Sequence, residues 1–187
     1  MSKIALTPNA SGSGTFTIAA PNSNTDRSLT LPDEAGTVLT SASSVTQNSG
    51  PAFSAYATAT QSISNGAFTK IIFNAEEYDT DGAFDSSTNY RFQPNVQGYY
   101  HLSVNLTNAD DSSAYRKIIE FYKNGSVYLR ANDMKVILER MSASLDIHLN
   151  GSSDYVEAFY YQENTSNISS TTKSLSSWFS GHLIRKA

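Results

Sequence analysis

The chain has 187 residues, 16% of them charged, a net charge of −4 at pH 7 and no cysteine. The lack of cysteine excludes disulfide frameworks, cysteine-ligated zinc and iron–sulfur sites. With a sequence pI near 5.3, the chain has no basic stripe of the kind that nucleic-acid binders present, so we expect no nucleic-acid partner. An apolar content of 39%, with 11 Tyr and 9 Phe, is enough for the core of one domain plus an extension.

Residues 1–14 contain no apolar run of the secretory-signal type, and no stretch approaches the roughly 20 apolar residues of a membrane helix. We therefore expect a protein made in the cytoplasm, with no membrane partner.

Residues 1–50 are poor in charge and in large apolar side chains, and their apolar residues occur in short alternating runs between Gly, Pro and Asn turns. Such a segment cannot bury enough surface to fold alone. It is predicted to be disordered, or to be ordered by packing against copies of itself or a partner. The apolar residues available for such packing are Ile4, Leu6, Phe16, Ile18, Leu29, Leu31, Val38 and Leu39.

Residues 14–40, GTFTIAAPNSNTDRSLTLPDEAGTVLT, resemble a segment common near the N-termini of phage tail fibres and other phage virion proteins. The resemblance implies an extended β arm that docks on the particle or leads into an intertwined trimeric shaft, with the eight apolar residues as candidate virion-docking positions. A flexible Ser/Thr-rich linker is the alternative. Residues 41–50, SASSVTQNSG, have linker composition, so we place the boundary between an arm at 1–50 and a head domain at 51–187.

The head domain is predicted to consist of β-strands. Residues 98–106 alternate strictly between apolar and polar side chains, which indicates a half-buried strand. Residues 115–129 read as a hairpin around Asn124-Gly125, the dipeptide that best tolerates the positive φ of a tight turn. Further strands are predicted over residues 51–55, 68–73, 145–149, 155–161 and 177–184.

The central part of the head contains six residues at characteristic spacings: Phe73, Asp79, Phe84, Phe92, Gly98 and Tyr100. These are the signature spacings of the C1q-like domain, which this part of the head resembles. The opening Pro51-Ala-Phe-Ser-Ala and the closing Phe179-Ser-Gly-x-Leu-Ile are similar to the ends of that family. The chain departs from the signature by one extra residue between Phe84 and Phe92, by Leu102 for Phe and by Val104 for an aromatic residue. The resemblance implies an all-β, antiparallel jelly-roll sandwich of the tumour-necrosis-factor superfamily, assembled as a homotrimer.

Residues 132–144 allow two interpretations. Met134, Ile137, Leu138 and Met141 have helical spacing behind a possible cap at Asn132 or Asp133. The C1q resemblance places a loop and a short strand there instead, and we favour strand or irregular structure.

The strand at 155–161 has apolar or aromatic residues on both faces apart from Glu157, a pattern typical of burial on both sides. One face of a two-sheet sandwich should meet solvent, so we expect the second face to contact another subunit. The candidate trimer-interface residues are Phe53, Tyr155, Phe159 and Tyr161.

The sequence assigns no catalytic residue, metal ligand or cofactor. His101, His148 and His182 fall on the polar sides of strands, which predicts surface imidazoles. Asp79, Asp81 and Asp85 surround Gly82 and could suit calcium, but the EF-hand loop and its terminal Glu are missing. No nucleophile elbow, P-loop or dinucleotide fingerprint occurs, so we do not expect an enzyme.

Together these features predict a homotrimeric bacteriophage virion structural protein, exposed on the particle as a capsid decoration (cement) protein or short fibre and contacting other virion proteins. The first alternative is a tail receptor-binding protein for host attachment, which would recognise a surface glycan through loops at 78–90, 107–115 and 161–173. A bacterial C1q-like surface protein is the second alternative, although the collagen-like Gly-x-y period typical of such proteins is missing.

Overall fold

The computed structural model describes residues 10–15, 17, 19, 22–26, 28, 50–107, 114–137, 140–163, 168–170 and 177–187. The chain divides into two units, Met1–Ser44 and Val45–Ala187. The eight predicted docking residues lie outside the described residues: Ile4, Leu6, Phe16, Ile18, Leu29, Leu31, Val38 and Leu39.

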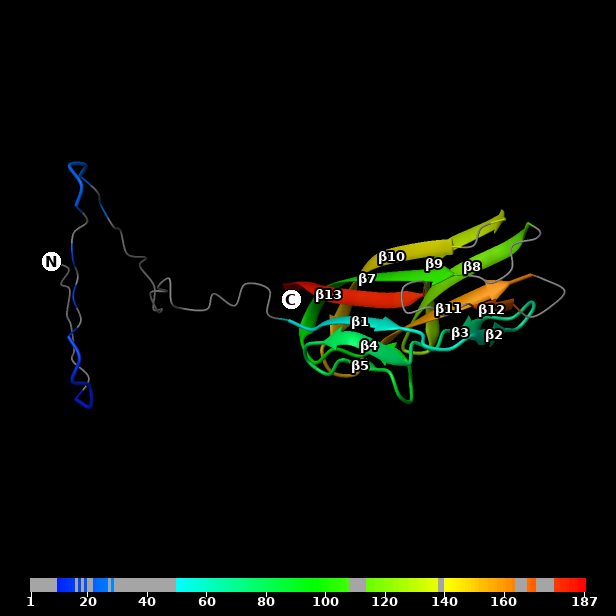
Figure 1. The fold of residues 1–187 in the computed structure, drawn as a ribbon, viewed down its shortest axis with the longest axis horizontal. Coiled ribbons are helices and arrows are strands. Elements are labelled where there is room, and N and C mark those ends of the chain that lie inside the picture. The colour runs from blue at the N-terminus through cyan, green and yellow to red at the C-terminus, as the bar shows by residue number, and fades with distance from the viewer. Residues whose placement is uncertain are drawn as a thin grey trace. The chain divides into compact units, whose positions relative to one another are not determined.

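The second unit is a sandwich of two main β-sheets (Figure 1). The five-stranded sheet has the order β10 (Arg140–Asn150), β7 (Gln97–Thr107), β13 (Trp178–Lys186), β1 (Ala52–Tyr56) and β4 (Ala75–Asp79). The six-stranded sheet has the order β5 (Phe84–Asp85), β6 (Arg91–Phe92), β11 (Val156–Gln162), β8 (Tyr115–Lys123) and β9 (Ser126–Val136), with β3 (Thr69–Lys70) also paired to β11. A small sheet joins β2 (Gln61–Ile63) to β12 (Ile168–Ser170).

Strands that are far apart in sequence are neighbours in both sheets, and the strand pairs are antiparallel. The first and last strands of the head, β1 and β13, lie side by side. The predicted all-β antiparallel sandwich is confirmed, and the described residues contain no helix.

The alternation predicted for residues 98–106 sets the inside and outside of β7. Tyr100, Leu102 and Val104 are fully buried, whereas Tyr99, immediately before Tyr100, is half exposed. β7 pairs with β10 on one edge and with β13 on the other. Residues of β10 and β13 that lie opposite the buried positions of β7 therefore also face inward.

Aromatic rings from both sheets meet in the core. Phe53 of β1 stacks on Phe84 and Phe92, with ring centroids 4.8 and 4.5 Å apart, and meets the edge of Phe179 at 5.0 Å. The structure corrects the assignment of Phe53 to a trimer interface, because its side chain is 0% exposed within a single chain. The alternation of β1 directs Phe53 inward with Ala55, so no surface remains for a second subunit to contact.

The hairpin predicted at Asn124-Gly125 is present between β8 and β9, and both residues have positive φ, 54° and 78°. The helical alternative for residues 132–144 is excluded, because β9 continues to Val136 and β10 begins at Arg140. Met134 pairs with Lys117 of β8, and Met141 pairs with Leu106 of β7. These strand contacts favour the extended backbone over the helix that the spacing of the apolar residues allowed.

The strand predicted over residues 68–73 is reduced to the two residues of β3. The side chain of Gln61 takes the place of a neighbouring strand: its Nε2 donates to the Lys70 carbonyl at 2.7 Å, and its Oε1 accepts from the Ile72 N–H at 2.9 Å. These two bonds satisfy the backbone without a longer ladder.

We expect Gly151→Ala to destabilise the fold more than Gly66→Ala. Both glycines have φ near +70°, so both substitutions carry the left-handed strain of roughly 1–2 kcal/mol. A Cβ on Gly151 would also collide with the Gln97 backbone N, whereas a Cβ on Gly66 meets nothing within 4 Å. Urea unfolding of both variants measures the difference, and equal losses would contradict the packing seen at Gly151.

Candidate functional site

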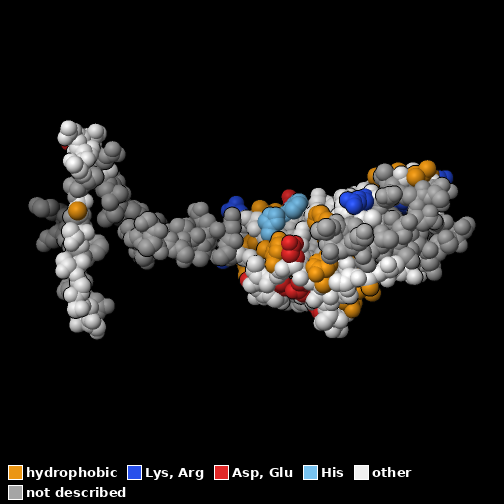
Figure 2. Space-filling view, in the orientation of Figure 1, with side chains coloured by type: hydrophobic (Ala, Val, Ile, Leu, Met, Phe, Trp, Pro, Cys, Tyr) orange, Lys and Arg blue, Asp and Glu red, His pale blue; other side chains and the backbone are white. Residues whose placement is uncertain are grey.

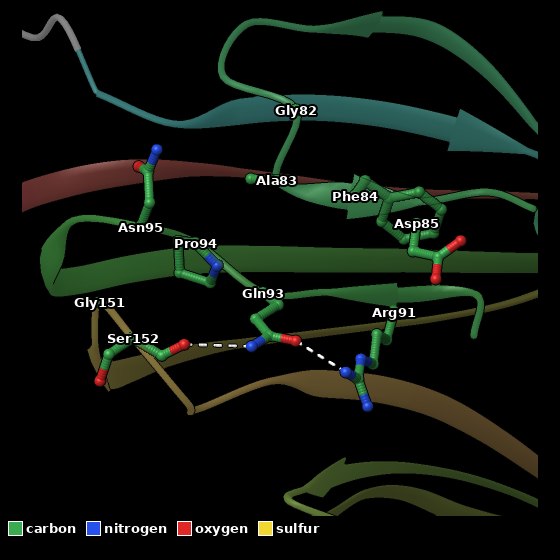
Figure 3. Close-up of a pocket in the computed structure, with 10 residues that line it drawn as sticks. All are labelled: Gly82, Ala83, Phe84, Asp85, Arg91, Gln93, Pro94, Asn95, Gly151 and Ser152. Atoms are coloured by element: carbon green, nitrogen blue, oxygen red, sulfur yellow. Dashed lines mark hydrogen bonds between the residues drawn. The ribbon is translucent and has the colours of Figure 1, made fainter. Parts of the chain in front are cut away.

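A polar pocket of about 470 Å³ lies among the loops that connect the two sheets (Figure 3). It is lined by residues 82–85 around the start of β5, by Arg91 of β6, by the following residues 93–95, and by the turn residues 151–152 after β10. Its lining combines one guanidinium, one carboxylate, two side-chain amides and a hydroxyl with a smaller apolar part. Polar groups of this kind at a pocket can fix the orientation of a bound ligand.

Arg91 is held in a fixed position at this pocket. Its guanidinium lies over the Tyr155 ring, 4.0 Å from the centroid, and its Nη2 donates to Gln93 Oε1 at 2.8 Å. Gln93 is fixed in turn, because its Nε2 donates to the Ser152 carbonyl at 3.1 Å (Figure 3). The chain of contacts therefore runs from the turn after β10 to the arginine on β6.

The carboxylate of Asp85 is fully engaged in its own turn. One oxygen accepts from the backbone N–H and hydroxyl of Ser87 and from the Thr88 N–H, and the other accepts from the backbone and side-chain nitrogens of Asn89. These donors, first the Thr88 backbone, hold the pKa of Asp85 well below its ordinary value of 3.8, against the effect of burial. Asp85 is therefore ionised throughout the physiological range.

The calcium interpretation of this loop has no geometric support among the described residues. The Asp79 carboxylate accepts from the backbone N–H groups of Asp81 and Phe84, at 3.3 and 2.7 Å. The part of the chain that the structure describes contains no group of three or more His, Cys, Asp or Glu side chains placed to hold a metal ion.

The outer face of the six-stranded sheet carries the three aromatic residues predicted at a trimer interface. Each already has a partner in its own chain. Phe159 stacks on Tyr122 with centroids 3.9 Å apart, Tyr161 packs on Phe68 at 5.0 Å, and Tyr155 supports Arg91. These contacts account for the aromatic character of the second face of β11, so a second subunit is not required to explain it.

Ion pairs lie between these rings. Glu157, 7% exposed, accepts from Lys70 Nζ at 3.0 Å, and Glu120, 1% exposed, accepts from Arg130 Nε at 2.7 Å. The second oxygen of Glu120 is buried and has no hydrogen-bond partner among the described residues. Arg130 is therefore the group that compensates a buried charge on this face.

The outward face of the five-stranded sheet has a different composition, with short polar side chains in rows across its strands. One row is formed by serines of β10, β7, β13 and β1, namely Ser144, Ser103, Ser180 and Ser54. The row on one side is formed by Asp146, His101, His182 and Ala52. The row on the other side is formed by Ser142, Asn105, Trp178 and Tyr56. Asp146 is the single charged side chain among these twelve residues.

The three histidines are partly or fully exposed, as the sequence predicted, and the structure places them on this same face, where histidine side chains gather (Figure 2). His101 Nδ1 lies 2.7 Å from Asp146 Oδ1, its ring is 5.7 Å from that of His182, and His148 packs on Tyr99 at 5.3 Å.

Residues 82–85 of the pocket belong to the loop at 78–90, one of three predicted to contact a glycan, and most of the other two, at 107–115 and 161–173, lies outside the described residues. Sequence reasoning did not find Arg91, Gln93 or Ser152. A single arginine before Phe92 carries no motif, and its partner Tyr155 is 64 positions away.

Comparison with known proteins decides the family. The family model of the C1q domain matches residues 52–184. The chain belongs to the C1q domain family. C1q domains are typically binding or structural modules, and the match indicates no enzyme family.

The solved structure of murine APRIL supports the fold. The crystal structure of murine APRIL at pH 8.5 is 9% identical, with a TM-score of 0.51 over 72% of this chain and 98% of APRIL. The globular domain of zebrafish complement 1qA protein is 16% identical, with a TM-score of 0.47 over 73% of this chain and 99% of that chain.

Among curated proteins, comparison by sequence finds no relative. The structure contains no helix able to span a membrane, within the part of the chain that it describes.

Asp85→Asn is expected to destabilise the head at pH 7, with an effect that fades in acid. Because folding lowers the pKa of Asp85, its contribution is fully present above the unfolded value of 3.8 and is lost as the pH falls toward the folded value. Unfolding free energies at pH 7 and pH 3 measure this change. Asp81→Asn, an exposed carboxylate in the same loop, is the control, and a pH-independent effect of Asp85→Asn would contradict the turn geometry.

Arg130→Gln is expected to destabilise the head markedly, because it leaves the buried Glu120 carboxylate without its cation. Arg116→Gln is the matched comparison. Arg116 pairs with Asp133 at 2.7 Å, but both side chains are substantially exposed, so its loss should destabilise the head much less than the loss of Arg130. Adding Glu120→Gln to Arg130→Gln should restore stability, and equal losses from the two single variants would contradict this ranking.

Proposed function

We propose that this protein is a homotrimeric structural protein of a bacteriophage particle, as a capsid decoration protein or short fibre. Its C1q domain forms the exposed head, and the arm at residues 1–50 docks on other virion proteins. The observation that carries the proposal is the combination in one chain of a C1q domain at 52–184 with an N-terminal segment that resembles phage fibre proteins. The expected location is the surface of the virion.

The outward face of the five-stranded sheet is the surface best suited to contact between copies. Interfaces between proteins are depleted of charged residues at their centres and enriched in aromatic ones. This face presents the serine row across four strands, with Trp178 in the adjacent row and the half-exposed Tyr99 two rows away, beyond His101. The outer face of the six-stranded sheet carries several ion pairs, which would be costly to desolvate.

The interface predicted from sequence, now reduced to Tyr155, Phe159 and Tyr161, competes with this proposal. Each of these residues is partly exposed, so a second subunit could reach it. The two faces lie on different sheets, and single substitutions therefore distinguish them.

Two other roles share the C1q head. A tail receptor-binding protein would use the loops, where the pocket around Arg91 offers a site for a polar ligand. A bacterial C1q-like surface protein would have the same head on a cell rather than on a particle.

Immunogold imaging of intact particles with an antibody against residues 51–187 tests the virion proposal. Label spread over the shell would support capsid decoration, and label confined to the tail would support a fibre or receptor-binding role. Label on the host cell envelope and not on particles would overturn the proposal in favour of the surface protein.

We expect Ser103→Arg to dissociate the trimer, because Ser103 occupies the middle of the serine row and a guanidinium there would be buried without a partner. Ser62→Arg, on the exposed surface of β2, should leave assembly unchanged. Sedimentation velocity measures the molar mass, and thermal unfolding verifies that each variant folds. Dissociation by Tyr161→Ala but not by Ser103→Arg would place the contact on β11 instead.

A further inference from the structure

The guanidinium of Arg91 gives this pocket a positively charged group. Among the described residues Arg91 lies within ion-pair distance of no carboxylate, although other arginines of the head, Arg116 and Arg130, are paired. Of its five N–H donors, one donates to a described residue, Gln93. The remaining donors are available to a ligand.

Arg91 is also preorganised. The Tyr155 ring on one side and the Gln93 amide on the other fix the guanidinium before any ligand arrives. An arginine that is already ordered loses little side-chain entropy on binding, and its planar fork matches the two oxygens of a carboxylate.

Asp85 does not compete with such a ligand. It is opposite Arg91 in the register of β5 and β6, yet its two oxygens accept five hydrogen bonds from residues 87–89. These donors hold the ionised carboxylate in its own turn, so it forms no ion pair with Arg91.

The rest of the lining suits hydroxyl groups. Asn95 is exposed at the pocket and offers both a donor and an acceptor, and the Ser152 hydroxyl can accept while it donates to Asn150. The volume of about 470 Å³ lies within the range of roughly 300–1,000 Å³ of small-molecule sites.

The geometry points to a binding site for a carboxylated sugar, with the sugar carboxylate on Arg91 and its hydroxyls on Asn95 and Ser152. This site is independent of where the protein resides and of assembly through the five-stranded sheet. Tyr155, which supports Arg91, also belongs to the competing interface on β11, and assembly there would reach this site. An acidic glycan of the uronic acid type is the class of ligand that combines one carboxylate with several hydroxyls.

Titration of the full chain with D-glucuronate, with D-glucose as the matched neutral sugar, tests this site. Chemical shift changes of the backbone amides report where each sugar binds. We expect glucuronate to bind at residues 82–95 and 151–152 at least tenfold more tightly than glucose, and to bind less tightly at high salt. Arg91→Gln should weaken glucuronate binding at least tenfold, whereas Arg140→Gln, at the far end of β10, should leave it unchanged.

Three results would overturn the inference: no binding of glucuronate at these residues, equal binding of the two sugars, or binding that Arg91→Gln does not weaken. Inorganic phosphate provides a further arm. If phosphate binds at Arg91 as tightly as glucuronate, the site recognises an anion rather than an acidic sugar. Arg91→Lys keeps the charge without the fork, so a loss in this variant as well supports bidentate recognition.

Discussion

The contact between the rings of Phe53 and Phe179 is the interaction on which the head depends. β1 and β13, the first and last strands of the domain, pair with each other, and each directs one of these rings into the core. Phe84 and Phe92, from the opposite sheet, stack on Phe53, while Phe121 of β8 reaches Phe179 at 6.2 Å. Burial of these rings holds the sheets together and closes the jelly roll at its ends.

The surfaces of the molecule follow from this inward packing. Since neighbouring strands share one register, the residues between the core positions of β7, β10 and β13 form continuous outward rows of serine, histidine and asparagine. The other sheet places ion pairs and aromatic pairs on its outer face. The polar pocket arises where Asp85 of β5 and Arg91 of β6 lie near the turn that contains Ser152.

Local rules predicted much of this fold. The alternation of residues 98–106 and the Asn124-Gly125 turn depend on nearest neighbours, and both are found in the structure.

The strand expected at 68–73 was predicted too long, because the Gln61 side chain supplies the hydrogen bonds that a strand would have given. Phe53 was assigned to a subunit contact, since the sequence does not reveal which of two apolar faces becomes the core. The Arg91–Tyr155 and Lys70–Glu157 contacts join residues more than sixty positions apart, beyond what spacing alone can predict.

Assembly is the central claim of this account, because a trimeric head is what makes a short arm with few core residues useful on a particle. Native mass spectrometry of the full chain tests it most directly. The account predicts a species of three times the 20.3 kDa chain mass that persists at low micromolar concentration. A species at the mass of one chain under the same conditions would contradict the trimer, and with it the proposed role of the serine-rich face.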